Sequence, residues 1–296
     1  MRISVLFFFT LCLMYSKAYS QKTEYESTTI SYNISSASNN EYKLNITFPS
    51  NYDSSKSYKV LYYFDAYALS GIVQGTYSIL HLLDKVENVV LIGISIDGNQ
   101  LDWNKQRVMD FTPTIFDLEK KRGKIKNSTL VFKSGMPSED VELNQNTTGG
   151  ANLFVDFLNS KVFKYIENKY PNLEKRRGFL GHSYAGLLGI YLVQNNPDLF
   201  QDMIIISASV SWNDNELLNL NLFSKFKESK KEYKIYHCYG GIEFGATTKS
   251  NDELHKLILE LEKENFDYNF KIYSEADHHS ILPSSIYDGL LYLYRK

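Results

Sequence analysis

The chain has 296 residues, with 32 Lys and Arg against 34 Asp and Glu, and 43% of its residues are hydrophobic. A chain of this length and apolar content buries a substantial core, so the composition excludes wholesale disorder. The near balance of charge excludes a dedicated nucleic-acid binder, whose affinity depends on clustered Lys and Arg meeting phosphates.

Residues 1–20 have the pattern of a leader. Arg2 precedes the apolar run Val5–Met14, and Ala18-Tyr19-Ser20 is a small-x-small cleavage site. The run is too short to span a bilayer, which is typical of a secretory signal peptide. We therefore expect a secreted or periplasmic protein, a mature chain without a membrane span, and a fold that begins at residue 21.

The mature chain opens with two β-rich runs, Thr28–Ile34 and Tyr42–Phe48, which predict an antiparallel hairpin. Short β-rich runs then alternate with longer helical patterns, the order of a mostly parallel twisted sheet with helices on both faces. The predicted strands are Lys59–Phe64, Asn88–Ile96, Arg177–Gly181, Met203–Ser207, Tyr233–Tyr239 and Asn269–Tyr273. The predicted helices lie near 74–86, 153–169, 184–195, 215–228, 251–265 and 284–294. We expect one α/β domain over residues 21–296.

The segment near 98–150 is different because its periodicity is weak. A connection this long inside a compact domain is usually functional or mobile. It contains Trp103, Arg107 and a charged run, Glu119–Lys126. We therefore interpret it as an insertion whose middle is surface and whose ends form possible walls of a site.

The strongest chemical signal is the run Gly181-His182-Ser183-Tyr184-Ala185-Gly186. It fits the G-x-S-x-G pattern, with Ala185 between the Ser and Gly186, and it follows a predicted strand and precedes a predicted helix. A turn this sharp strains the Ser backbone, and small neighbours avoid clashes with adjacent elements. The Ser183 hydroxyl would then stand at a helix N-terminus, where developing negative charge is stabilised. The pattern predicts a nucleophilic Ser183.

A Ser hydroxyl needs a base to take its proton. Among the six His, His81, His237 and His255 fall inside predicted elements, and His182 would point away from Ser183. The remaining pair, His278 and His279, follows the last predicted strand, which is where the α/β-hydrolase order Ser, acid, His requires the base.

The acid should follow the preceding strand, where it orients the imidazole. Glu243 lies on a loop directly after Tyr233–Tyr239. Asp252 is the competitor, although it resembles part of a capped helix start. A Ser–His pair without an acid stays open as a third possibility.

Two backbone N–H groups should hold the oxyanion of an acyl-transfer reaction. One is the N–H of Tyr184, and the other should come from the loop Phe64-Asp65-Ala66-Tyr67. The sequence has no H-E-x-x-H, C-x-x-C, P-loop or dinucleotide-binding motif, so we expect no metal and no cofactor.

These motifs resemble the Putative esterase family of the α/β-hydrolase superfamily, in its siderophore-esterase-like and feruloyl-esterase-like branch. The run ending in Asp65 is similar to the family's Leu-Asp-Gly, with Ala66 in place of the Gly. The stretch Arg107–Thr114 is similar to an Arg-x-x-Asp-Thr-Pro-like motif, and Gly149-Gly150-Ala151 resembles the start of the helix before the nucleophile strand.

The resemblance implies that Ser183 is the nucleophile, that His278 rather than His279 is the base, and that Tyr67 supplies the second oxyanion N–H. It implies a carboxylic ester hydrolase acting on a small-molecule or carbohydrate ester, such as a siderophore, feruloyl or acetylated-sugar ester. An acyltransferase with the same triad, a peptidase and a non-catalytic ligand-binding relative remain open, and oligomeric state is not readable.

Two side chains are candidates for substrate binding, Arg107 and Trp212. Arg107 could contact an acidic or catecholate group. An equally good interpretation pairs Arg107 with Asp110 and packs the Trp residues in the core.

Overall fold

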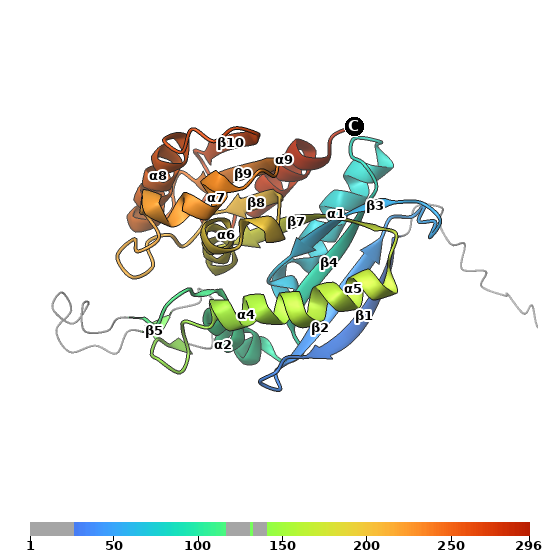
Figure 1. Ribbon diagram of the computed structural model, residues 1–296, viewed down its shortest axis with the longest axis horizontal. Coiled ribbons are helices and arrows are strands. Elements are labelled where there is room, and N and C mark those ends of the chain that lie inside the picture. The colour runs from blue at the N-terminus through green and yellow to red at the C-terminus, as the bar shows by residue number, and fades with distance from the viewer. Residues whose placement is uncertain (1–26, 117–130, 133–140) are drawn as a thin grey trace, which may run out of the picture.

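The computed structural model describes residues 27–116, 131–132 and 141–296. The predicted leader and most of the charged middle of the 98–150 segment lie outside these residues. The main sheet has eight strands in the order β1-β2-β4-β3-β7-β8-β9-β10 (Figure 1). The strands are β1 (Thr28–Ser35), β2 (Glu41–Phe48), β3 (Tyr58–Tyr63), β4 (Val89–Ile96), β7 (Leu173–His182), β8 (Asp202–Ile206), β9 (Tyr233–Gly240) and β10 (Phe266–Tyr273).

The predicted hairpin and the mostly parallel sheet are both confirmed. β1 pairs antiparallel with β2, and β2 pairs antiparallel with β4. From β4 through β3, β7, β8 and β9 to β10, every neighbouring pair is parallel. The carboxyl ends of these parallel strands therefore meet along one edge of the sheet.

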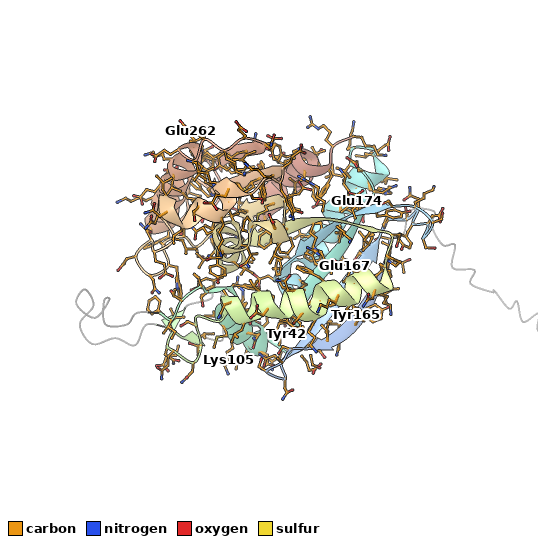
Figure 2. The ribbon with its side chains drawn as sticks, viewed as in Figure 1. Tyr42, Lys105, Tyr165, Glu167, Glu174 and Glu262 are labelled. Carbon is orange, nitrogen blue, oxygen red and sulfur yellow. The ribbon has the colours of Figure 1, made fainter. Side chains whose placement is uncertain are left out.

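Helices cover both faces of the sheet, as expected for strands that are buried on both sides. The helices α1 (Ala66–Leu82) and α9 (Leu282–Tyr294) pack on one face. The other face carries α2 (Gln100–Phe111), α4 (Ala151–Phe157), the π-helix η1 (Leu158–Val162), α5 (Phe163–Lys169), α6 (Tyr184–Asn195), α7 (Ser224–Glu228) and α8 (Gly245–Leu259). The α4–α5 segment crosses this face near Tyr42 of β2 (Figure 2). Tyr42 packs against Phe154 and Phe157 of this segment. The described residues also form short elements: β5 (Val131–Phe132), β6 (Val141–Glu142), and the 3-10 helices η2 (Pro197–Leu199) and η3 (Leu220–Phe223).

The helix α2 was not predicted, because the 98–150 segment has weak hydrophobic periodicity. Its buried side is partly polar and includes Arg107 and Asp110. The sequence does contain a start signal for α2, a capping box. The Asn99 side chain accepts from the N–H groups of Leu101 and Asp102, and the Asp102 side chain accepts from the N–H of Asn99. A polar buried stripe hides a helix from an argument based on apolar spacing.

Three other helix predictions need correction. The first helix begins at Ala66 rather than near 74, and its early turns contain Gly71 and Gly75, which dilute the helical signal. The helix predicted near 251–265 begins at Gly245, so Asp252 lies inside α8 and does not start it. The region 215–228 forms only η3 and α7.

Candidate active site

Ser183 lies at a strained strand-to-helix turn. It follows β7 directly and is the N-cap of α6, with φ 59° and ψ −116°. A Cβ at Gly181 would stand 2.5 Å from the carbonyl oxygen of Ala185, and a Cβ at Gly186 would stand 2.9 Å from the Cα of Ala208. Only glycine fits at these two positions, because the turn brings α6 against its own strand and against the chain after β8. The strained backbone holds the Ser183 hydroxyl at the carboxyl edge of the sheet.

A continuous hydrogen-bond chain runs from Ser183 through an imidazole to a carboxylate. The Nε2 atom of His278 lies 2.9 Å from Ser183 Oγ, and its Nδ1 atom lies 2.7 Å from Glu243 Oε2. Since a carboxylate only accepts, Nδ1 carries the proton and donates to Glu243. Nε2 is then free to accept the hydroxyl proton of Ser183, which is the arrangement of a nucleophile activated by an oriented base.

Glu243 is held as a carboxylate by three donors. Its Oε1 atom accepts from the Ser207 hydroxyl and, at 2.7 Å, from the N–H of Gly240. Burial alone would raise the pKa of Glu243, but the hydrogen bonds from His278, Ser207 and Gly240 outweigh burial and lower it. The group is therefore charged at neutral pH and able to stabilise an imidazolium.

The structure also separates the competing candidates. His279 lies beside His278, with ring centroids 5.3 Å apart, and its backbone N–H donates to Asp277 in the turn that shapes this loop. Asp252 accepts from the Tyr239 hydroxyl at 2.6 Å instead of meeting an imidazole. His278 and Glu243 are thus the pair that the fold brings to Ser183.

His182 has a role that the sequence argument missed. Its side chain is buried, and its Nε2 atom lies 2.7 Å from the backbone carbonyl oxygen of His278. A carbonyl only accepts, so Nε2 carries the proton. Burial and the neighbouring His278 lower the pKa of His182 well below its usual value, which keeps the ring neutral. The residue before the nucleophile therefore tethers the loop that carries the base, a contact that no spacing rule indicates.

The two expected oxyanion donors stand at the N-termini of α6 and α1. Tyr184 is the first residue of α6, and Tyr67 is the second residue of α1. The N-terminal end of a helix carries partial positive charge and favours developing negative charge beside it. The strands that lead to them, β3 and β7, are hydrogen-bonded neighbours, with the Phe64 N–H donating to the Leu180 carbonyl at 3.0 Å.

A cleft of about 430 Å³ opens over Ser183 and His278. Trp212 lines it, as the sequence suggested, and packs against Phe116 with ring centroids 5.0 Å apart. The remaining lining residues are Leu143, Tyr184, Ser209, Ser211, Glu243, Phe244 and Thr247. The walls that the structure describes are thus mainly aromatic and hydroxylic.

Arg107 is not among the residues that line this cleft. Its guanidinium is buried and binds Asp65, not Asp110 and not open solvent. The expectation that Arg107 contacts a substrate anion therefore does not match its position, because both fork-shaped hydrogen bonds are already used on a protein carboxylate.

The chain is similar to several known proteins. A family model described as Putative esterase matches residues 35–279. The ferri-bacillibactin esterase BesA of Bacillus subtilis (strain 168) is 26% identical over 254 residues, which cover 83% of this chain and 82% of BesA. The BES protein from Bacillus cereus has a similar fold, with a TM-score of 0.75 and 22% identity over 92% of this chain and 97% of that one. The siderophore hydrolase EstA from Aspergillus nidulans has a TM-score of 0.70 and 20% identity over 90% and 93% of the two chains.

The mixed sheet with helices on both faces is that of an α/β hydrolase, as the sequence predicted. Since the family model spans most of the chain, the chain belongs to the Putative esterase family, and the resemblance drawn from its motifs is confirmed. Its relatives are named esterases and hydrolases, and this protein is a carboxylic ester hydrolase. Within the described residues, we find no helix with the length and apolar content that crossing a bilayer requires.

Proposed function

We propose that this protein is a secreted serine esterase that cleaves an ester bond of a siderophore through an acyl-enzyme. The observation that carries the proposal is the hydrogen-bond chain from Ser183 Oγ to His278 and on to Glu243. The names of the relatives, a ferri-bacillibactin esterase and a siderophore hydrolase, support the substrate class. The leader-like residues 1–20 support secretion.

In the proposed reaction, Ser183 Oγ attacks the ester carbonyl carbon while His278 Nε2 takes the hydroxyl proton. The carbonyl oxygen becomes an oxyanion held by the N–H groups of Tyr67 and Tyr184. The imidazolium then gives its proton to the leaving alcohol, and the acyl group remains on Ser183. A water molecule then attacks the acyl carbon and gives its proton to His278. The bond from the acyl carbon to Ser183 Oγ breaks, Oγ takes the proton back from His278, and the acid leaves, while Glu243 holds the imidazole in position throughout.

The test compares Ser183→Ala with a matched loss of another buried hydroxyl, Ser285→Ala, in α9 on the opposite face of the sheet. Ser183→Ala should lower kcat on p-nitrophenyl acetate by roughly 10⁵-fold and abolish fluorophosphonate labelling, whereas Ser285→Ala should keep both. A Ser183→Ala variant that stays active refutes the serine mechanism.

The substrate class needs its own measurement. The purified enzyme is assayed on a siderophore triester, a feruloyl ester and an acetylated sugar, with and without an added alcohol. The proposal expects the highest kcat/KM on the siderophore ester and a free acid as product. A higher value on either other ester overturns the substrate, and transfer to the alcohol in preference to water indicates an acyltransferase.

A further inference from the structure

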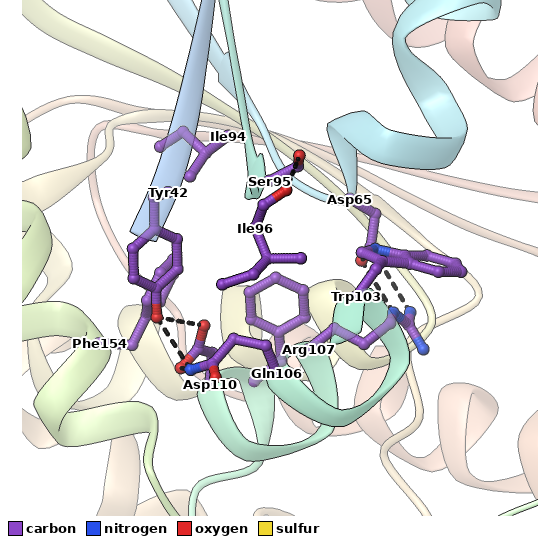
Figure 3. Close-up of a pocket in the computed structure, with 11 residues that line it drawn as sticks. Tyr42, Asp65, Ile94, Ser95, Ile96, Trp103, Gln106, Arg107, Asp110 and Phe154 are labelled. Carbon is purple, nitrogen blue, oxygen red and sulfur yellow. Dashed lines mark hydrogen bonds and ion pairs between the residues drawn. The ribbon is translucent and has the colours of Figure 1, made fainter. Parts of the chain in front are cut away.

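A buried ion pair connects α2 to the start of α1. Arg107 donates from Nε and Nη2 to the two oxygens of Asp65, both at 2.8 Å, and Trp103 Nε1 donates to Asp65 Oδ1 at 2.9 Å (Figure 3). Asp65 is 3% and Arg107 is 8% exposed. Replacing a buried ion pair by well-packed apolar side chains is often neutral or stabilising, so this pair is weak evidence of a role in stability alone.

Asp65 occupies a special place in the chain. It is the N-cap of α1 with φ 56°, a left-handed conformation that costs free energy for any residue other than glycine. Its carboxylate does not cap α1 and turns instead to α2. Tyr67, two residues later, carries the N–H of the oxyanion site, and its ring stacks on Trp103 with centroids 5.3 Å apart. The ion pair and the stacking together fix the turn that aims this N–H.

The same guanidinium also reaches the other half of the oxyanion site. The Arg107 Cζ atom lies 5.4 Å from the ring centroid of Tyr184 and 5.1 Å from that of Trp103. Tyr184 carries the second oxyanion N–H, and cation–π contacts at this distance are attractive. One buried cation therefore touches the segments that carry both donors.

From this geometry we propose that Arg107 is the positioning residue of the oxyanion site. It sets the spacing between the Tyr67 and Tyr184 N–H groups through Asp65 and the Tyr184 ring, and it contacts no substrate. The inference rests on the proposed serine mechanism. Donors fixed in place before the reaction stabilise the transition state without reorganisation, so loosening them should lower kcat more than it changes KM.

The experiment uses three variants of the full chain. Arg107→Lys keeps the charge and loses the two-pronged bond, and Arg107→Met loses both. Trp103→Phe keeps an aromatic ring for stacking and loses the Nε1–H together with one ring of the indole. Fluorophosphonate titration counts the competent sites, so kcat is expressed per site and a poorly folding variant still gives a usable rate. A trifluoromethyl ketone adds a second readout, since its Ser183 adduct places an oxyanion in the same site.

We expect kcat per site to fall about 100-fold to 1,000-fold in Arg107→Met, about tenfold to 100-fold in Arg107→Lys and a few-fold in Trp103→Phe, with KM within about threefold of wild type. The inhibition constant of the ketone should rise in parallel with the loss in kcat. An unchanged kcat per site in Arg107→Lys and Arg107→Met, or an unchanged ketone affinity, overturns the inference.

A control pair with the same bond pattern, but less buried, lies at the opposite edge of the sheet. Arg176 makes the same two-pronged pair with Asp202, at 2.8 and 2.6 Å, where β8 begins. Arg176→Lys should leave kcat per site and ketone affinity at wild-type values; an equal loss in Arg176→Lys assigns the effect to general destabilisation and refutes the role of Arg107. If Ser183→Ala is inactive while Arg107→Met is normal, only this inference fails and the serine mechanism stands.

Discussion

Two carboxylates, Glu243 on the loop after β9 and Asp110 in α2, are almost equally buried and have opposite acid strength. Glu243 is 9% exposed and Asp110 is 6% exposed. The pKa of Glu243 is lowered, whereas burial raises the pKa of Asp110 to about 7. Burial by itself therefore does not decide the charge of a carboxyl group in this protein.

The difference comes from what faces each carboxylate. Glu243 receives a backbone N–H, a hydroxyl and the imidazole of His278, which becomes cationic in the proposed reaction. From the residues that the structure describes, Asp110 receives only neutral donors, the Tyr42 hydroxyl at 2.8 Å and the Gln106 amide at 2.7 Å, beside a cavity of about 10 Å³ (Figure 3). One environment prepares a charged group for catalysis, and the other keeps an acid close to its neutral form.

Among the changes that test this comparison of the two carboxylates, the largest expected effect is from replacing the acid, Glu243→Gln. The Gln oxygen should remain where Ser207 and Gly240 donate, so its NH₂ group would donate to His278 Nδ1. The imidazole would then hold its proton on Nε2, the wrong atom to accept the Ser183 proton. We expect kcat on p-nitrophenyl acetate to fall about 10³-fold to 10⁴-fold. A loss below tenfold in steady-state kinetics would mean that Ser183 and His278 act as a dyad.

The order of the strands explains how much of this site was predictable. Ser183, Glu243 and His278 each follow a parallel strand, and parallel strands bring their carboxyl ends to one edge whatever the side chains are. The chain order of the three residues and of the strands before them was therefore enough to predict that their side chains lie close together. The strands themselves were predictable because a run such as β4 is apolar on both faces, which is typical of a strand inside a covered parallel sheet.

The contacts between side chains were not predictable in this way. Asp65 and Arg107 are 42 residues apart, and their pairing depends on a helix whose buried side is polar. His182 acts on the backbone carbonyl of His278, which has no side-chain signature. Hydrophobic periodicity reports which face is buried, and it carries no information on which polar groups meet there.

A second prediction separates the two carboxylates by pH. Between pH 4 and 7 the folded protein keeps a proton on Asp110 that the unfolded chain releases. The free energy of unfolding therefore falls as the pH rises toward about 7 and levels off above that pH. A pKa moved from 3.8 to about 7 corresponds to at most about 4 kcal/mol. Asp110→Asn should remove this decline, measured as the free energy of unfolding in urea at pH 5 and pH 8.

Glu243→Gln is the matched comparison for that measurement. The pKa of Glu243 is lowered in the folded protein, so its contribution is complete above the ordinary value near 4.5 and is lost as the pH falls below it. The variant should change stability on the acidic side and leave the decline between pH 5 and 8 intact. If the free energy of unfolding changes with pH in the same way in wild type and in Asp110→Asn across that range, the assignment to Asp110 is wrong.

The smallest expected effect concerns Ser207, whose hydroxyl donates to Glu243 from a fully buried position with φ 45°. Ser207→Ala removes one of the donors that hold the carboxylate, worth about 1–2 kcal/mol, so kcat should fall roughly tenfold and acid unfolding should begin at a higher pH. Ser207→Gly removes the same hydroxyl but relieves the left-handed backbone. Equal losses of kcat in both variants, with Ser207→Gly the more stable, assign the effect to the hydrogen bond; normal kcat in either one means that Gly240 and His278 alone suffice to hold Glu243.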